Sequence, residues 1–304
     1  MQSSSLPIIG WIGTGVMGEP MASHLIKNGY TVHVNTRTKG KAQALIEAGA
    51  IWEETPKALA GKVDRLFLML GYPKEVEDLV FNADTGIIWE MKDGSILIDH
   101  TTNSPDLAKR IHEEGKKRGI KVLDCPVTGM SISAKSGALS AMIGGDLDTL
   151  ELVKPQLQCY CKELNILGPA GSGQHAKVAN QIMAGINMIA VCEGLIYGHK
   201  AGLNLEQLLP IITKGTGSSF LLQHMGPKCL KRDYSPGIYI ELFMKDLTIA
   251  IEEARRLKLS LPVFGVTAQL FQMVEALGIE GISAHAVICV LEKINGLEIK
   301  KYDF

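Results

Sequence analysis

The segment IIGWIGTGVMGEPMASHLIKNGY, residues 8–30, constrains the fold more than any other part of the chain. It carries Gly13, Gly15 and Gly18 in the order G-x-G-x-x-G, after a β-branched run and before a helical stretch. At such a junction glycines allow a tight turn and a close approach of backbone N–H groups to a pyrophosphate, which the helix N-terminus also favours. The context predicts a dinucleotide-binding βαβ unit rather than a glycine-rich turn without a ligand. The candidate contacts are Gly13, Thr14, Gly15, Val16, Met17 and Gly18.

Short apolar runs and helical stretches alternate through the rest of the first half. Strands are expected at 8–13, 31–35, 65–70, 95–100 and 121–126, with helices at 17–28, 39–48, 74–82 and 105–118. Two more strands, at 139–145 and 163–168, are joined by a helix at 147–158. The runs show little polar alternation, which suits strands covered on both faces. Their order predicts right-handed βαβ units and a parallel sheet.

The pattern changes near residue 170. Ser172–Lys200 contains no proline and predicts one helix of 29 residues, on the order of 43 Å long at 1.5 Å per residue. Further helices are expected at 204–214, 218–231, 241–257, 261–277 and 283–294, and no convincing strand follows Leu167. The predicted fold is therefore α/β: a Rossmann-type doubly wound, mainly parallel sheet over residues 1–169, followed by an all-helical domain over 170–304 that begins with a long interdomain helix.

Charge and composition exclude several classes of function. Lysine and arginine number 31 against 32 acidic residues, a balance that argues against a general nucleic-acid or anionic-membrane surface. The longest apolar run, 181–198, contains Asn187 and Glu193 and is expected to be a buried helix rather than a membrane span. The N-terminus shows no basic n-region or cleavage site, so no secretory signal is expected. The six cysteines are scattered, which favours reduced thiols in a cytoplasmic protein. The histidines form no metal-binding pair, so no metal is expected.

The stretch VHVNTRTKGK, residues 32–41, has reversed charge where a dinucleotide site usually offers an acid to the ribose. Thr36 lies 36 − 13 = 23 positions after Gly13, close to the expected spacing of about 20. This position has no carboxylate, and the next residue is Arg37, whose planar guanidinium suits phosphate. The hydroxyl groups of Thr36 and Thr38 can donate hydrogen bonds to the same phosphate. We interpret this as recognition of the 2′-phosphate of NADP(H), with NAD the less favoured cofactor; the alternative is an ordinary solvated basic turn.

Polar residues interrupt the long apolar helix on one face. Lys177, Asn180 and Gln181 stand at i, i+3 and i+4. A lysine near the start of such a helix, at a domain boundary, suits general acid–base work once its pKa is lowered by desolvation. The alternative is a surface lysine at a helix end.

Two strand ends carry further polar residues. DHTTNSP (99–105) offers Thr102, and DCPVTGMS (124–131) offers Thr128 and Gly129, at the carboxyl edge where open parallel sheets bind ligands. Helix capping is the ordinary alternative for both segments. FMKDLTIA (243–250) places Lys245 in an apolar helix, where an exposed ion pair with its neighbour is the alternative to a role in binding.

Taken together, four segments resemble the β-hydroxyacid dehydrogenase family, from Ile8 to about Asn295. They are GWIGTGVMGEPMASHL, DCPVTGM, GSGQHAKVANQ and FMKDLTIA. The resemblance implies that Lys177 is the general acid/base, that Asn180 and Gln181 orient a small carboxylated substrate, and that Thr128 and Gly129 hold its carboxylate. It further implies that Thr102 and Lys245 contact the cofactor near the nicotinamide, and that Arg37 and Thr38 match the N-R-T of NADP-preferring members.

The sequence departs from the family pattern at two places in the substrate segment. Thr128 replaces a serine and keeps the hydroxyl, whereas Met130 replaces a glycine and adds bulk. The expected activity is NADP(H)-dependent hydride transfer between a small 3-hydroxy acid and its semialdehyde. There are two rival interpretations. One is an imine reductase of the same architecture, which Lys177 disfavours. The other is a non-enzymatic dinucleotide-binding module, which the presence of Lys177, Asn180 and Thr128 disfavours. The apolar helices past residue 180 suggest a homodimer or homotetramer.

Overall fold

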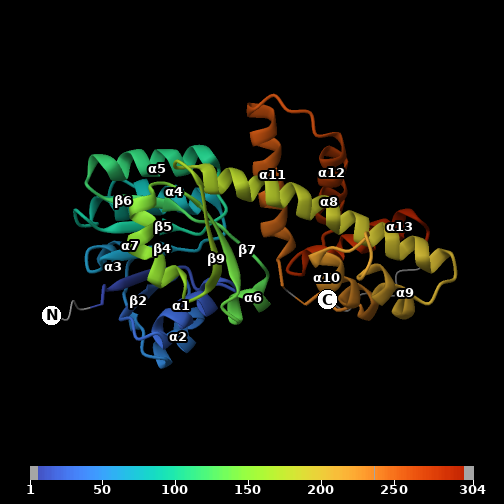
Figure 1. Ribbon diagram of the computed structural model, residues 1–304, viewed down its shortest axis with the longest axis horizontal. Coiled ribbons are helices and arrows are strands. Elements are labelled where there is room, and N and C mark those ends of the chain that lie inside the picture. Colours follow the sequence, from blue (N-terminus) through green and yellow to red (C-terminus); the bar gives the residue numbers. More distant parts are fainter. Residues whose placement is uncertain (1–5, 236, 298–304) are drawn as a thin grey trace. The chain divides into compact units, whose positions relative to one another are not determined.

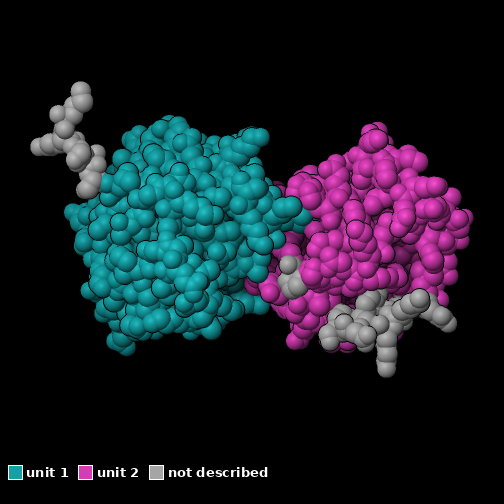
Figure 2. Space-filling model, turned by 90° about the horizontal axis from the view of Figure 1, so that it is seen from below, with its two compact units in different colours: residues 1–177 teal, residues 178–304 magenta. Residues whose placement is uncertain are grey.

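The computed structural model describes residues 6–235 and 237–297 (Figure 1). Contacts within the chain divide it into two compact units, residues 1–177 and 178–304, which Figure 2 shows in different colours. The division falls inside one long helix, because the first turns of this helix contact the sheet. The domain boundary expected between residues 169 and 170 stays a prediction.

The first unit is built on a nine-stranded sheet. Its strands are β1 Ile9–Ile12, β2 Val32–Asn35, β3 Ile51–Trp52, β4 Arg65–Leu68, β5 Ile96–Asp99, β6 Lys121–Asp124, β7 Val127–Thr128, β8 Leu139–Gly144 and β9 Cys161–Gly168. The order β3-β2-β1-β4-β5-β6 is entirely parallel and is that of a Rossmann fold. β8 then pairs antiparallel with both β6 and β7, and β9 pairs parallel with β8. The predicted fold class is confirmed.

Helices cover both faces of this sheet (Figure 1). They are α1 Gly18–Lys27, α2 Gln43–Glu47, α3 Pro56–Ala60, α4 Pro73–Phe81, α5 Pro105–Lys117, α6 Ser131–Lys135 and α7 Leu147–Leu157. Buried side chains separate into two clusters, one joining α1, α2 and α7 to the sheet and the other joining α3, α4 and α5 to it. Alternate residues of a strand enter different clusters: Phe67 belongs to the first, Leu66 and Leu68 to the second. β1 and β5 are buried at every residue because both faces of the sheet are covered there.

The second unit is helical. It comprises most of α8 Ser172–Lys200, then α9 Leu205–Ile212, α10 Phe220–Lys231, α11 Ile240–Arg256, α12 Pro262–Ala276 and α13 Val287–Ile294. The rings of Phe243 on α11 and Phe271 on α12 lie 5.1 Å apart in its core. Across the described residues after β9, the β pairing that occurs is an isolated bridge between Tyr239 and Ser283. α8 has the length and composition of a membrane span, a property that buried helices of water-soluble proteins share.

A buried aromatic cluster joins the central strands of the first unit. Trp11 stacks on Phe67 at 5.5 Å and on His100 at 5.8 Å, and Tyr160 meets Trp11 edge-on at 5.9 Å. His100 Nδ1 lies 2.6 Å from the carbonyl oxygen of Cys125, and its Nε2 lies 2.9 Å from the Tyr160 hydroxyl. The cluster therefore ties β1, β4 and β5 to the residues that follow β6 and precede β9.

Burial shifts the pKa values of two adjacent residues at the end of β5, Asp99 and His100, in opposite directions. Burial lowers the pKa of His100 to about 4. Burial also raises the pKa of Asp99 to about 6, although its carboxylate accepts hydrogen bonds from Thr101 N–H (2.9 Å) and Asn103 Nδ2 (2.6 Å). His100 is thus neutral in the folded protein at pH 7. Asp99 loses its proton at a higher pH in the folded protein than in the unfolded chain.

These shifts predict opposite pH dependences for two variants. Between pH 6.5 and 4 the unfolded chain protonates His100 before the folded protein does, so this residue makes the free energy of unfolding fall as the pH falls. Asp99 ionises first in the unfolded chain, so its contribution falls as the pH rises from about 4 to 6. Relative to wild type, Asp99→Asn should gain stability, and His100→Asn lose it, as the pH rises through this window, each by on the order of 3 kcal/mol. Urea unfolding at several pH values measures both slopes, and slopes of the same sign would contradict the assignment.

Candidate active site

The three glycines of the loop after β1 stand in different environments. Gly13 has φ +99°, and a Cβ there would collide with the carbonyl oxygen of Met69. A Cβ on Gly18 would collide with the carbonyl oxygen of Gly13, because α1 begins against the turn. A Cβ on Gly15 would meet no atom within 4 Å. Gly13 and Gly18 therefore shape the loop, whereas Gly15 leaves open space beside the backbone.

Thr14 supports the interpretation of this space as a ligand cradle. Its side chain is buried, with 3 % exposure, yet its Oγ1 has no hydrogen-bond partner in the described part of the chain. Buried hydroxyls without partners are rare, and one beside a glycine loop at a helix N-terminus fits a polar ligand such as a pyrophosphate. Val16 is exposed, and Met17 is half-buried at the start of α1. The loop thus fits the group that the sequence predicts for it.

The reversed-charge stretch lies at the end of β2, next to β1. Thr36 is half-buried, and Arg37 and Thr38 are exposed. Arg37 Nη1 forms an ion pair of 2.7 Å with Glu75 Oε1, at the first turn of α4. The sequence predicts the arginine but not its acidic partner, because the two residues follow different strands.

Two carboxylates end neighbouring strands at the edge where a ligand is expected. Asp99 and Asp124 are paired in the register of β5 and β6, and both are buried. Burial raises the pKa of Asp124, and backbone N–H groups from the start of α8 oppose this effect. Asp124 accepts hydrogen bonds from Gly171 N–H (2.7 Å) and Gln174 N–H (2.9 Å), so it caps α8. Sequence reasoning missed this role, although aspartates ending two successive strands were a visible signal.

Gln174 connects α8 to the loop after β5. It is fully buried; its Nε2 donates to the Thr101 carbonyl (2.8 Å), and its Oε1 accepts from Asn103 N–H (2.9 Å). These two bonds bracket Thr102, which is half-buried. The Thr101 hydroxyl in turn accepts from Leu70 N–H at 3.0 Å, after β4. The loop that carries Thr102 is therefore held from both sides.

Lys177 lies one turn further along α8. Its Nζ donates to the carbonyl oxygen of Val127 at 2.8 Å, and its side chain is half-buried. Val127 directly precedes Thr128 and Gly129, so the structure brings the predicted acid/base to the predicted substrate segment. Gly129 has φ +123°, a conformation that side chains disfavour. Met130, the departure from the family pattern, is 6 % exposed and stands at the start of α6.

The remaining predicted residues form a hydrogen-bonded chain in the second unit. Asn180 Nδ2 donates to Gln181 Oε1 (2.7 Å), and Gln181 Nε2 donates to Asp246 Oδ2 (2.6 Å). Lys245 Nζ pairs with Asp246 Oδ1 at 2.7 Å, and both side chains are nearly buried. The ion pair of Lys245 is thus not an exposed one. In the sequence, Asp246 is notable only as the ion-pair neighbour of Lys245, and its link to Gln181 is not predicted.

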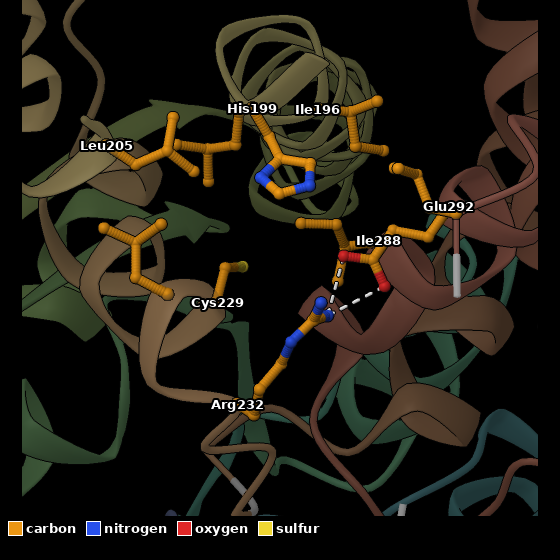
Figure 3. Close-up of a pocket in the computed structure, with 10 residues that line it drawn as sticks. Ile196, His199, Leu205, Cys229, Arg232, Ile288 and Glu292 are labelled. Atoms are coloured by element: carbon orange, nitrogen blue, oxygen red, sulfur yellow. Dashed lines mark hydrogen bonds and ion pairs between the residues drawn. The ribbon is translucent and has the colours of Figure 1, made fainter. Parts of the chain in front are cut away.

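The second unit also contains a cavity of about 320 Å³. Its lining comes from α8, α9, α10 and α13, and includes the ion pair between Arg232 and Glu292, with Nη1 2.7 Å from the carboxylate (Figure 3). His199 and Ile196 project toward it from α8 (Figure 3). No residue predicted for the active site lines this cavity.

Known proteins share this sequence and fold. The family model described as the NAD binding domain of 6-phosphogluconate dehydrogenase matches residues 8–168, and that described as NAD-binding of NADP-dependent 3-hydroxyisobutyrate dehydrogenase matches residues 171–291. A probable 3-hydroxyisobutyrate dehydrogenase-like protein 1 of Arabidopsis thaliana is 39 % identical over 295 residues, covering 97 % of this chain and 88 % of its own. The chain belongs to the β-hydroxyacid dehydrogenase family.

Two further proteins show the extent of the similarity. The 2-hydroxy-3-oxopropionate reductase of Escherichia coli K12 is 34 % identical over 284 residues, covering 93 % of this chain and 97 % of its own. The solved structure "Psf3 in complex with NADP+ and 2-OPP" superposes with a TM-score of 0.88 at 27 % identity, over 93 % of this chain and 100 % of that one. As a member of the β-hydroxyacid dehydrogenase family, the chain is an NAD(P)-dependent oxidoreductase, the enzyme class that its sequence predicts.

The loop geometry predicts different results for two glycine substitutions. Gly15→Ala places a methyl group in open space, so the melting temperature should stay within about 2 °C of wild type. The Kd for NADPH should rise roughly tenfold or more, because the methyl group would occupy the space expected for the pyrophosphate. Gly13→Ala should instead lower the stability by about 2–3 kcal/mol, through its positive φ and the contact with Met69. Thermal unfolding and NADPH fluorescence titration separate the two effects. Unchanged NADPH affinity in Gly15→Ala would remove this loop from the cofactor site.

Proposed function

We propose that this protein catalyses NADP(H)-dependent hydride transfer between a small carboxylated 3-hydroxy acid and its semialdehyde. The placement of Lys177 is the observation that carries the proposal. Its ammonium lies 2.8 Å from the carbonyl oxygen of Val127, directly before the Thr128–Gly129 segment. A proton donor held at this edge of the sheet suits an oxygen that changes between hydroxyl and carbonyl.

Lys177 transfers the proton in the proposed reaction. During oxidation its neutral amine accepts the hydroxyl proton as the carbon–oxygen double bond forms, and during reduction its ammonium returns the proton to the carbonyl oxygen. The bound nicotinamide supplies or accepts the hydride. The contact with the Val127 carbonyl limits the side chain to a small range of positions before the substrate arrives, which reduces the cost of orientation.

The Thr128 hydroxyl and the backbone of Gly129 hold the substrate carboxylate. A carboxylate beside the reacting carbon provides binding energy that orients the hydroxyl toward the lysine. Asn180 and Gln181 orient the substrate, as the family resemblance implies. Their hydrogen bonds to each other and to Asp246 restrict their rotamers, which supports a positioning role.

NADP(H) is the proposed cofactor, with NAD less favoured. The open side of Gly15 and the buried Thr14 hydroxyl support a pyrophosphate at the loop, and exposed Arg37 with Thr36 and Thr38 supports a 2′-phosphate at the end of β2. Thr102 and Lys245 are assigned contacts near the nicotinamide. The superposed Psf3 structure is a complex with NADP+, which is consistent with this preference.

The rival imine reductase activity is disfavoured by the lysine and by the identity of 34–39 % to the two hydroxyacid enzymes named above. Oxidation of NADPH, followed by absorbance with glyoxylate and a panel of semialdehydes and cyclic imines, distinguishes the two activities.

We also propose that the protein forms a homo-oligomer and is cytoplasmic. Val263 and Val266 on α12 are exposed apolar residues, which favours self-association.

Replacement of the lysine tests the mechanism. Lys177→Ala should lower kcat by about 10²–10⁴ and leave the Kd for NADPH within about twofold of wild type, because the amine acts on the substrate oxygen. Lys200→Ala, at the exposed end of the same helix, is the matched control and should retain full activity. Stopped-flow measurement of NADPH oxidation gives the rate. Near-normal turnover of Lys177→Ala would exclude the proposed acid/base.

Replacement of the arginine tests the cofactor preference. Arg37→Ala should raise the Kd for NADPH by roughly 10- to 100-fold, because a charge-assisted hydrogen bond to phosphate is lost, and should change the Kd for NADH little. Lys41→Ala removes an exposed charge from the same stretch and should have a much smaller effect. Fluorescence titration with both cofactors is the measurement. Equal effects of Arg37→Ala on NADPH and NADH would contradict recognition of the 2′-phosphate.

A further inference from the structure

The partner of Arg37 is unusual for a phosphate-binding arginine. The guanidinium is highly exposed, with 88 % of its side chain accessible, yet its Nη1 lies 2.7 Å from the carboxylate of Glu75. Exposed ion pairs of this kind contribute little to stability. A role in ordering the arginine is therefore a better explanation than a role in holding the fold together.

Glu75 is itself held in place by the backbone. Its Oε2 accepts from Gly71 N–H (3.1 Å) and Tyr72 N–H (3.2 Å), which caps the start of α4, while its Oε1 binds Arg37. Both carboxylate oxygens are thus engaged. Only 26 % of the side chain is accessible, so Glu75 is the fixed partner and Arg37 the one that it orders.

The sheet places this pair beside the glycine loop. β2 and β4 flank β1 on either side, with Asn35 paired to Ile12 and Leu68 paired to Ile12 at the carboxyl ends. Arg37 follows β2 and Glu75 follows β4, so the ion pair connects the two segments that flank the exit of β1. An adenosine phosphate that extends from the glycine loop toward the end of β2 would meet the guanidinium at this point.

We propose that Glu75 is a positioning residue that increases selectivity for the 2′-phosphate of NADP(H). This inference rests on the proposed function, in which Arg37 binds that phosphate. A free arginine side chain loses much rotamer freedom when it binds, and a carboxylate that already holds one end of the guanidinium removes part of this loss. The guanidinium carries five N–H donors, so the contact through Nη1 does not exhaust its fork.

The negative charge of Glu75 also repels a phosphate, and this effect opposes the first. Two observations favour ordering as the larger effect. The carboxylate accepts two backbone N–H groups at a helix N-terminus, which offset its charge, and its fixed position leaves the exposed Arg37 as the group that is ordered. The geometry therefore assigns Glu75 a favourable net contribution to NADPH binding.

Glu75→Gln is the informative substitution, because an amide has one acceptor oxygen where the carboxylate uses two. It can keep the cap or the contact with Arg37, but not both. The Kd for NADPH should rise roughly 3- to 10-fold, the range expected for ordering one long side chain, and the Kd for NADH should stay unchanged. Fluorescence titration of the full-length protein with NADPH and NADH provides both constants without knowledge of the substrate.

Three further variants make the result specific. Glu75→Asp retains a charge at the start of α4 but is too short to span to Arg37, so it should reproduce the loss for NADPH and keeps the test valid if Glu75→Gln folds poorly. Glu77→Gln, on the same helix, removes an exposed ion pair with Arg110 (2.9 Å) and should change neither Kd. In an Arg37→Ala background, Glu75→Gln should cause no further rise in the Kd for NADPH, because only the repulsion between Glu75 and the phosphate is then left to remove.

The outcomes distinguish this inference from the proposed function. An unchanged or lower Kd for NADPH in Glu75→Gln overturns the positioning role, as does an equal rise for NADPH and NADH or a rise that persists without Arg37. If Arg37→Ala itself leaves the ratio of the two constants unaltered, the NADP preference fails first. A selective rise that disappears in the double variant supports the inference.

Discussion

The contact between the Asp124 carboxylate and the first turn of α8 is the interaction on which the proposed site depends. Both oxygens accept backbone N–H groups, from Gly171 and Gln174, and a negative charge at a helix N-terminus is further stabilised by the helix dipole. The fit leaves no room for larger residues: a Cβ on Gly144 would lie 2.5 Å from Asp124 Oδ1, and one on Gly173 would lie 2.8 Å from the Asp124 carbonyl oxygen. The end of β6 thereby determines where α8 begins.

The contact of Asp124 with α8 also determines where the proposed active-site residues of the first unit lie. Lys177 is one turn beyond the capped residues, and it reaches the Val127 carbonyl three residues after β6 ends. Gln174, on the same capped turn, holds the loop that contains Thr102. The proposed acid/base, the proposed carboxylate-binding segment and the β5 loop are therefore related through contacts with backbone groups, whose positions vary less than those of side chains. Catalysis by proton transfer requires this kind of precision.

Much of this architecture is encoded in patterns that a single sequence displays. The glycine loop, the five main strands and α8 are predicted well, because unalternating apolar runs and an uninterrupted 29-residue helix have few alternative folds. β3 and α3 are missed, since two and five residues are too few to show a period. The buried polar contacts are missed for another reason: Asp124, Gln174 and His100 look like ordinary polar residues until the register of the sheet brings distant segments together. Lys177 contacts a backbone carbonyl, that of Val127, and no side-chain pattern reveals such a contact.

The same limit applies to cofactor selection. The end of β2 presents an arginine where an acid is usual, and its sequence position alone predicts a preference for phosphate. The acid is nevertheless present: Glu75 follows β4, 38 positions later (75 − 37 = 38), and contacts that arginine across the exit of β1. The segments that follow neighbouring parallel strands lie side by side. The electrostatic potential at a bound ribose would therefore depend on the charges of both the segment after β2 and the segment after β4. At the proposed adenosine end, the local charge depends on both Arg37 and Glu75. A substitution on α4 would therefore alter this charge without any change in the glycine loop or in residues 32–41.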